Sequence, residues 1–254
     1  MRENILGYQV TTWSLGQCID DIIATMESSK PAAWMACLNP HSYAVARHDE
    51  HFQQALKSAD WLVPDGMGIV VASKIMGGRI RERVTGPDLF MALHDRLNIM
   101  GGKSVFFLGA SEYTLAAIRN RMHERFPNIR VAGTYSPPFR VSYSEDELQD
   151  MVKQINSSGA DVLWVGMTAP KQERWILDNL PTLNIRFAGA VGAAFDFFTG
   201  GVKRSPAIFR KLGLEWLPRL LQQPRRLWRR TFISAPIFFC HVLVEATFRR
   251  FSGT

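Results

Sequence analysis

Short apolar runs alternate with segments of helical periodicity through most of this 254-residue chain, and this alternation constrains the fold more than any other feature. Runs rich in β-branched or aromatic residues and separated by helices are typical of a parallel sheet covered on both faces. Repeated strand–helix units require right-handed crossovers, so the sequence predicts a Rossmann-like, doubly wound α/β fold with a mostly parallel sheet. The predicted strands are 33–38, 61–63, 104–108, 129–133, 161–165 and 185–190. The predicted helices are about 42–59, 68–76, 88–100, 111–126, 144–157 and 170–180.

The last 52 residues, 203–254, carry nearly all of the chain's excess positive charge. They hold 11 Lys and Arg residues and two acids, whereas residues 1–202 hold 19 Lys and Arg residues and 21 acids. A near-neutral body with a cationic tail indicates an anionic partner, such as nucleotide phosphates, a lipid head group or a nucleic acid. We therefore divide the chain into a Rossmann-like domain that carries the site, 1–202, and a basic helical appendage, 203–254.

Within the tail, residues 231–248 are mostly apolar, and these 18 residues are barely enough to cross a bilayer. Pro236, His241 and Glu245 interrupt the segment and are costly in hydrocarbon. One interpretation is an amphipathic helix in the membrane interface, with its arginines meeting anionic lipid. The other is a helix packed on the body with its arginines on the solvated face, and charge alone favours neither. Nucleic acid is disfavoured because the aromatic residues form apolar blocks rather than spaced stacking platforms.

The cysteines and the missing motifs exclude several classes of protein. Cys18, Cys37 and Cys240 have no CxxC spacing, which argues against a disulfide framework and a thiolate zinc site and fits a reducing compartment. The N-terminus lacks the apolar core of a signal peptide, so export by that route is not expected. No HExxH, GxSxG or P-loop motif occurs, which disfavours the corresponding hydrolases and NTPases. We expect neither a bound metal nor a cofactor.

Ligand sites in doubly wound folds lie at the carboxyl ends of the strands, where two polar residues are candidates. Asn39 directly follows the first predicted strand and offers both donor and acceptor groups. Asp65 lies between a proline and a glycine after the next strand, and this fixed, accessible position suits a general base. Taken alone, each residue is more simply explained as part of a turn.

Later strand ends add five candidates for substrate binding. Gly109 precedes a helix whose first backbone N–H groups could hold a phosphate or a ribose edge. Gly166 allows a ligand to approach the backbone closely, and Lys171 and Gln172 follow in the first turn of the next helix. Lysine suits a phosphate, and glutamine suits an amide or a sugar hydroxyl. Asp196 lies in an apolar stretch and needs a partner if buried. The simpler alternatives are well-capped helices and, for Asp196, an ion pair with an arginine of the tail.

Several motifs, taken together and in order, resemble one family. They are Pro64-Asp65-Gly66-Met67-Gly68, Glu82-Arg83-Val84-Thr85-Gly86-Pro87-Asp88, Pro170-Lys171-Gln172-Glu173 with Trp175, and Phe195-Asp196-Phe197 with Gly200. In the tail they continue as Lys203-Arg204-Ser205-Pro206, Gly213-Leu214-Glu215-Trp216 with Arg219, and Pro224 with Arg226, Arg229 and Arg230. The ordered set resembles the bacterial TagA-type (WecG/TagA/CpsF) glycosyltransferases. Members of that family transfer N-acetylmannosamine, its uronate or glucose in the synthesis of wall and surface polysaccharides.

The resemblance implies an enzyme that moves a sugar from a UDP-sugar to a polyprenyl-diphosphate-linked saccharide, with inversion and without a metal. It implies that Asp65 is the general base and that Asn39 lines the sugar pocket. It further implies that Gln172 and Asp196 are polar active-site residues and that Arg83 binds substrate.

The resemblance also gives the tail a role. Arg219, Arg226 and Arg229 match arginines that close over the site and stabilise the diphosphate leaving group, because a cation must offset its developing charge.

The resemblance also implies a location, which is the cytoplasmic face of the bacterial plasma membrane with peripheral binding, and it is compatible with a homo-oligomer. Cys37 stands where the family often has Thr, so the donor sugar stays open. A non-catalytic nucleotide-binding protein, with a tail that docks on a membrane or partner, is the alternative.

Overall fold

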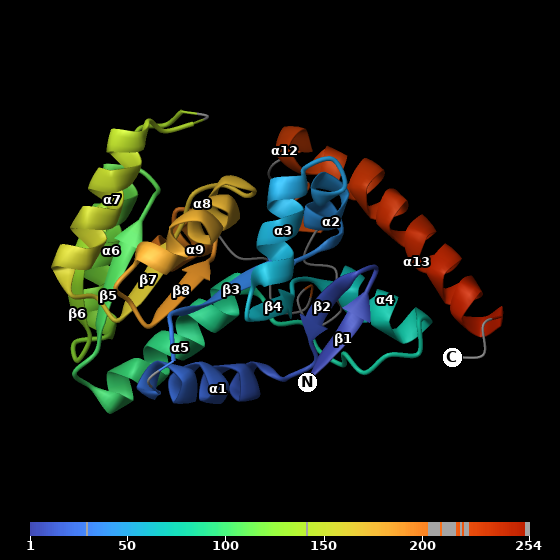
Figure 1. Ribbon diagram of the computed structural model, residues 1–254, viewed down its shortest axis with the longest axis horizontal. Helices are drawn as coiled ribbons and strands as arrows, with labels where there is room; N and C mark the ends of the chain where they lie inside the picture. Colours follow the sequence, from blue (N-terminus) through green and yellow to red (C-terminus); the bar gives the residue numbers. More distant parts are fainter. Residues whose placement is uncertain are drawn as a thin grey trace.

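The computed structural model describes residues 1–28, 30–140, 142–202 and 224–251, with isolated positions 209, 217, 218 and 220; the side chain of Arg226 is not described. Six parallel strands form one sheet in the order β4-β3-β8-β7-β5-β6, and β1 and β2 form a separate antiparallel hairpin (Figure 1). The strands are β1 Arg2–Ile5, β2 Tyr8–Thr11, β3 Ala33–Leu38, β4 Trp61–Pro64, β5 Ser104–Leu108, β6 Arg130–Tyr135, β7 Val162–Val165 and β8 Phe187–Ala190. The predicted parallel sheet is confirmed.

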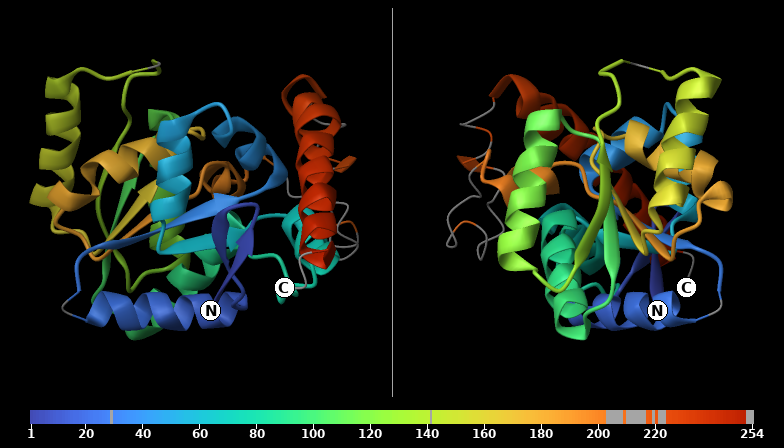
Figure 2. Two further views of the ribbon diagram at one scale, coloured as in Figure 1. Left: turned by 45° about the vertical axis from the view of Figure 1, so that its right-hand side comes forward. Right: turned by 90° about the vertical axis from the view of Figure 1, so that its left-hand side faces the viewer.

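Two helical layers cover the sheet, because alternate side chains of each strand point to opposite faces. Trp34 and Leu38 pack with α2, α3, α7 and α8, whereas Met35 and Trp61 pack with α1, α5, α6 and α9. Figure 2, right, shows the sheet edge-on, between α6 and α5 on one side and α7 and α8 on the other. The helices of the body are α1 Leu15–Glu27, α2 Pro40–Ala46, α3 Glu50–Ser58, α4 Met67–Ile75, α5 Gly86–Met100, α6 Glu112–Arg125, α7 Glu145–Ser158, α8 Lys171–Asn179 and α9 Ala194–Thr199.

The predicted helix at 42–59 is wrong as a single element, because the chain turns between α2 and α3. Asp49 caps α3, and its carboxylate accepts a hydrogen bond of 3.0 Å from the backbone N–H of Phe52. An aspartate that caps one helix has non-helical backbone angles and therefore ends the preceding one. The sequence analysis also missed the β1–β2 hairpin, helix α1 and helix α9. For α1, the signal was available in the capping box formed by Ser14 and Gln17.

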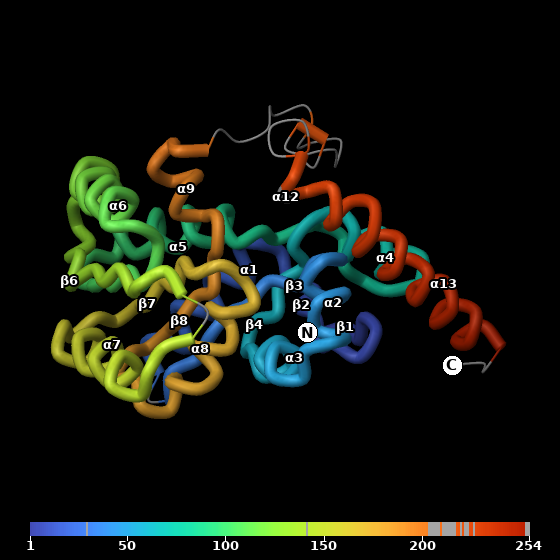
Figure 3. The backbone as a smooth tube through the Cα atoms, turned by 90° about the horizontal axis from the view of Figure 1, so that it is seen from above, coloured from blue at the N-terminus to red at the C-terminus, as the bar shows by residue number. Residues whose placement is uncertain are grey.

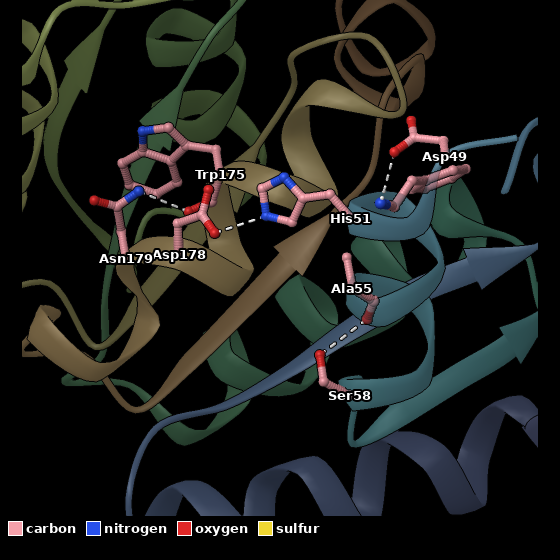
Figure 4. A network of polar contacts seen from close by, with 8 residues as sticks. Asp49, His51, Ala55, Ser58, Trp175, Asp178 and Asn179 are labelled. Atoms are coloured by element: carbon pink, nitrogen blue, oxygen red, sulfur yellow. Dashed lines mark hydrogen bonds and ion pairs between the residues drawn. The ribbon is translucent and has the colours of Figure 1, made fainter.

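Polar contacts tie α3 to α8 across the top of the sheet (Figure 4). His51 Nε2 lies 2.8 Å from Asp178 Oδ1, and the Arg174 guanidinium forms an ion pair with the Asp49 carboxylate. Asp49 is therefore both the cap of α3 and a partner of α8. These contacts fix the first turn of α8, which follows a strand end and carries two of the site candidates.

In the continuous stretch of the basic tail that the structure describes, 224–251, three helical segments follow one another: α12 Pro224–Arg229, the π-helix η2 Arg230–Ser234 and α13 Ala235–Phe251. Phe238, Val242 and Ala246 recur every four residues along α13 and are buried. Helix α13 contacts α2 and α4, and Figure 3 shows it alongside α4. The interpretation of this segment as a helix packed on the body is thus confirmed for one of its faces.

Polar contacts from the described part of the tail fasten it to the body. The Ser234 hydroxyl lies 2.9 Å from His41 Nδ1, the Tyr43 hydroxyl lies 2.6 Å from His241 Nδ1, and Arg249 donates to the backbone oxygen of Asn4. The histidine that the sequence analysis treated as costly in hydrocarbon thus has a protein partner. The division into domains at residues 202 and 203 stays a prediction.

By length and composition alone, the helical stretch Leu227–Phe251 could cross a membrane. Its most apolar window has a mean hydropathy of 1.6, and 22% of that window is buried. The same test is passed by helices that pack on a soluble body, so this property is compatible with both interpretations of the tail.

Candidate active site

A cavity of about 1140 Å³ opens at the carboxyl ends of the strands. Residues that follow β3, β4, β5, β7 and β8 line it, as expected for a doubly wound fold. Six of the predicted site residues line this cavity: Asn39, Asp65, Arg83, Gly166, Gln172 and Asp196. The structure therefore brings together side chains that are up to 157 positions apart in the sequence.

Asp65 and Asn39 form a pair at the floor of the cavity. Strands β3 and β4 are adjacent and parallel, with Leu38 opposite Pro64, so the two residues that follow these strands lie side by side. The Asn39 amide donates to Asp65 Oδ2 at 3.1 Å, and the backbone N–H of Asp65 donates to the Leu38 oxygen at 2.8 Å. Asn39 Oδ1 accepts from the N–H groups of His41 and Ser42 at the start of α2. The carboxylate is thus held in one orientation beside open volume, as a general base requires.

Two glycines of the motif after β4 have separate structural reasons. Gly66 has φ +89°, a conformation that side chains other than glycine rarely adopt. At Gly68, a Cβ atom would lie 2.5 Å from Pro40 Cγ, so the first turn of α4 packs directly on the first turn of α2. The motif therefore positions Asp65 and brings α4 close to the site.

Arg83 reaches the cavity because its segment returns to the end of β4. The backbone N–H of Val84 donates to the Pro64 oxygen at 3.0 Å. Two residues further, Thr85 caps α5 and also lines the cavity, with its hydroxyl donating to Asp88 Oδ2 at 2.7 Å. The motif at 82–88 thus supplies a cation and a hydroxyl to the same edge of the sheet as Asp65.

Gln172 and Glu173 form a buried polar pair in the first turn of α8. Gln172 Oε1 accepts from the backbone N–H of Gly192 at 3.1 Å, and Gln172 Nε2 donates to Glu173 Oε1 at 2.9 Å. The two residues are 4% and 3% exposed, and Glu173 Oε2 has no hydrogen-bond partner among the described residues. Burial raises the pKa of Glu173 to about 7, and the bond from Gln172 opposes this shift. The sequence analysis named Glu173 only within a motif and missed it as a cavity residue.

The raised pKa of Glu173 predicts a pH-dependent stability. The folded protein holds this proton between pH 4.5, the unperturbed pKa, and about 7, so the free energy of unfolding decreases as the pH rises through this window. By linkage the full change is on the order of 3 kcal/mol. The glutamine of the Glu173→Gln variant cannot ionise. The free energy of unfolding of the variant, relative to that of the wild type, should therefore increase between pH 4.5 and pH 8. Urea denaturation at both pH values measures this difference; an equal difference at the two would contradict the assignment.

Gly109 and Gly166 serve packing more than ligand access. A Cβ at Gly166 would lie 2.2 Å from the Phe195 ring, so this aromatic side chain fills the space beside the glycine. Gly109 has φ +101°, and a Cβ there would lie 2.9 Å from the Gly166 carbonyl carbon. Gly109 does not line the cavity, although its neighbours Ala110 and Ser111 do. The predicted helix N-terminus at this place is confirmed, because Ser111 caps α6.

Lys171 points away from the cavity, contrary to the prediction. Its ammonium donates to the backbone oxygen of Arg140 and lies 3.8 Å from the centroid of the Tyr143 ring. Burial is the main cause that lowers the pKa of Lys171. Side chains in the first turn of a helix point in several directions, and in the first turn of α8 only those of Gln172 and Glu173 line the site.

The tail closes one side of the cavity with Leu227, Arg230, Thr231, Ala235 and Phe239. Arg229, predicted to stabilise the leaving group, is exposed, and its guanidinium lies 6.0 Å from the centroid of the Trp228 ring. The neighbouring Arg230 takes the inward position. Arg219 and the side chain of Arg226 lie outside the described residues.

His41 links the tail to the floor of the site. Its ring lines the cavity and contacts Ser234 of the π-helix. Burial and the nearby Arg230 charge lower the pKa of His41 to about 4, so the ring is neutral at pH 7. The sequence analysis did not identify His41 as part of the site. Within the described ranges, no group of three or more His, Cys, Asp or Glu side chains is arranged to hold a metal ion.

Comparison with known proteins gives consistent matches over nearly the whole chain. The model of the "Glycosyl transferase WecG/TagA/CpsF family" matches residues 3–252. A Bacillus spizizenii (strain W23) protein named N-acetylglucosaminyldiphosphoundecaprenol N-acetyl-beta-D-mannosaminyltransferase is 33% identical over 89% of this chain and 84% of its own length. Proteins of the same name from Bacillus subtilis (strain 168) and Staphylococcus aureus (strain MW2) are 31% and 29% identical. They match 96% and 93% of this chain, and 91% and 90% of their own lengths.

Proposed function

Because the chain belongs to the WecG/TagA/CpsF family of glycosyl transferases, we propose that it moves a sugar from a UDP-sugar to a saccharide carried on a polyprenyl diphosphate. The relatives' names include a diphosphoundecaprenol acceptor, which supports a lipid-linked acceptor for this chain. The observation that carries the proposal is the Asp65–Asn39 pair at the floor of a large cavity that also contains Arg83 and Arg230.

The proposed reaction is a single displacement with inversion. Asp65 takes the proton from the acceptor hydroxyl while the oxygen of that hydroxyl attacks the anomeric carbon of the donor. The bond from that carbon to the UDP oxygen breaks, and its electron pair stays on the β-phosphate. Arg83 and Arg230 offset the charge that develops there. Residues at the α6 N-terminus, Ser111 and Thr114, line the same cavity and suit a phosphate or ribose oxygen.

For the donor sugar, the relatives' names make N-acetylmannosamine the first candidate, with its uronate and glucose as the others. Cys37 lines the cavity and carries a thiol in place of the hydroxyl that the family often has there. Burial raises the pKa of this thiol well above its usual value, so it stays protonated and is a weak hydrogen-bond donor. Cys37→Thr should therefore change the preference among donors more than the rate with the best one.

The direct test is UDP release by the purified protein with a GlcNAc-diphosphoprenyl acceptor and each of the three UDP-sugars. We expect acceptor-dependent release with one donor, and the same rate in the presence of EDTA. Binding of UDP by calorimetry without release from any donor would instead favour a non-catalytic nucleotide-binding protein. Loss of activity in EDTA, restored by a divalent cation, would contradict metal independence.

The outer face of the tail supports peripheral binding at the cytoplasmic face of the membrane. Along α12, η2 and α13, the tail exposes several large apolar side chains: Trp228, Phe232, Ile233, Leu243, Val244, Phe248 and Phe251. Arg225, Arg229 and Arg250 are exposed on the same segment. Such a surface suits the interface of a bilayer that contains anionic lipid.

Phe248→Glu is expected to weaken binding to vesicles of anionic phospholipid by about tenfold or more, because a Phe side chain that becomes buried in the bilayer contributes roughly 1.5–3 kcal/mol to binding. Phe248 is 66% exposed, so the substitution should leave the fold intact. Co-sedimentation with the vesicles measures the effect. Ile99→Glu is the matched control, since Ile99 is 81% exposed on α5 of the body. Equal binding by the two variants would exclude this face as the membrane contact.

A further inference from the structure

The cavity has two walls of different chemistry. The wall at the strand ends carries the acidic side chains, Asp65 and Asp196. The wall formed by α4 and the tail carries most of its apolar side chains in Met67 and Val71 from α4, Leu227 from α12 and Phe239 from α13; we call these four residues the apolar wall. A saccharide and a diphosphate need only the first wall, so the second indicates that an apolar part of a ligand occupies the same cavity.

The parts of the apolar wall from α4 and α13 adjoin each other, although they are far apart in the sequence. Helix α13 contacts α4, and a Cβ at Gly68 would lie 4.0 Å from Phe239 Cζ. Leu227 is 8% exposed, whereas Met67 and Val71 are 37% and 39% exposed. The wall therefore combines one buried apolar residue with two that are partly exposed to solvent, and exposed apolar surface of this kind often marks a binding site.

The tail supplies both a cation and apolar side chains to the cavity. Arg230 lines the cavity and lies in the chain between Leu227 and Phe239, both of which belong to the apolar wall. The cation assigned to the UDP leaving group and part of the apolar wall therefore come from the same tail segment. The exposed apolar face of the tail begins on the same helices, at Trp228 and Phe232.

We infer that the wall of Met67, Val71, Leu227 and Phe239 is a subsite for the first isoprene units of the polyprenyl diphosphate acceptor. This inference rests on the proposed function and adds to it the path of the lipid. The prenyl chain leaves the active site between α4 and the tail, so the reaction takes place beside the bilayer and the acceptor does not have to be extracted fully from it. Isoprene units are flat, branched and apolar, which matches Val, Leu, Met and Phe side chains.

The test compares two soluble acceptors with the same GlcNAc-diphosphate head, one with a single isoprene unit and one with three, below their micellar concentrations and without vesicles. We expect the wild type to use the longer acceptor with at least tenfold higher kcat/KM. Val71→Asn and Met67→Gln should each reduce this ratio severalfold, and Val71→Asn should leave kcat/KM for the one-unit acceptor within about twofold. Both residues are more than one-third exposed, so neither variant opens a core cavity. Ile99→Asn is the matched control and should keep the wild-type ratio.

The outcomes separate the subsite from the function it depends on. A wild-type ratio in both variants, or equal loss with both acceptors, would overturn the subsite and leave the transferase intact. A wild-type enzyme without chain-length preference would do the same. No transfer to either acceptor by the wild type would overturn the proposed function, and the subsite with it.

Discussion

Asp65→Asn is expected to lower kcat by roughly 10²–10⁴-fold, the range attributed to general acid–base catalysis. The amide keeps the size of the carboxylate and can still pair with Asn39, whose amide lies 3.1 Å from Asp65 Oδ2. It cannot accept the proton of the acceptor hydroxyl at neutral pH. The binding of UDP should change little, because Asp65 is assigned to the acceptor. Single-turnover kinetics with saturating donor and acceptor measures the loss, and calorimetry measures the UDP affinity.

Asn39→Ala is the companion variant, because it removes the group that orients the carboxylate without removing the carboxylate. We expect a smaller loss than for Asp65→Asn, together with a lower thermal stability, since Asn39 also caps α2. If Asp65→Asn retained wild-type turnover, Asp65 could not be the base. Loss of UDP binding along with turnover would instead place Asp65 against the donor.

The sheet and its strand-end site could be predicted because both depend on local patterns. Continuous apolar runs mark strands that are buried on both faces, and the residue after each strand must lie at the same edge of a parallel sheet. Asn39 and Asp65 were therefore found by position before any contact was known. The same reasoning could not show that they pair, since the pairing depends on β3 and β4 being neighbours.

At two of the predicted site residues, the surroundings differ from those expected. Gly166 lines the cavity, but the space that a side chain would occupy beside it is filled by Phe195 of α9, an element that the sequence analysis did not assign. Lys171 lies in the expected helical turn, yet its ammonium lies on Tyr143, which belongs to the β6–α7 connection. Both outcomes depend on long-range packing, which periodicity and turn chemistry do not determine.

Charge composition identified a cationic tail, and the family resemblance implied that its arginines close over the site, but neither identified Arg230 as an arginine that lines the cavity. The phase of the tail helix is set by the burial of Phe238 and Val242 and by the contact between His41 and Ser234. The π-helical segment η2, Arg230–Ser234, lies at this contact and changes the rotation per residue relative to an α-helix. Arg229 and Arg230 contribute equally to the charge composition of the tail. Only the rotation of the helix about its axis determines which of the two faces the cavity.

Because the two arginines face different directions, Arg230→Gln and Arg229→Gln are expected to have different effects on kcat. Arg230 lines the cavity and its charge acts on His41, whereas Arg229 is exposed above Trp228. Removing one preorganised cation or donor from a developing anion typically costs about 10²–10³-fold in kcat. We therefore expect a loss of that size for Arg230→Gln, and less than about threefold for Arg229→Gln in a detergent-solubilised assay. Steady-state kcat at saturating substrates measures both. The reverse order would show that the tail turns on substrate binding and that Arg229, as the motifs alone imply, faces the leaving group during catalysis.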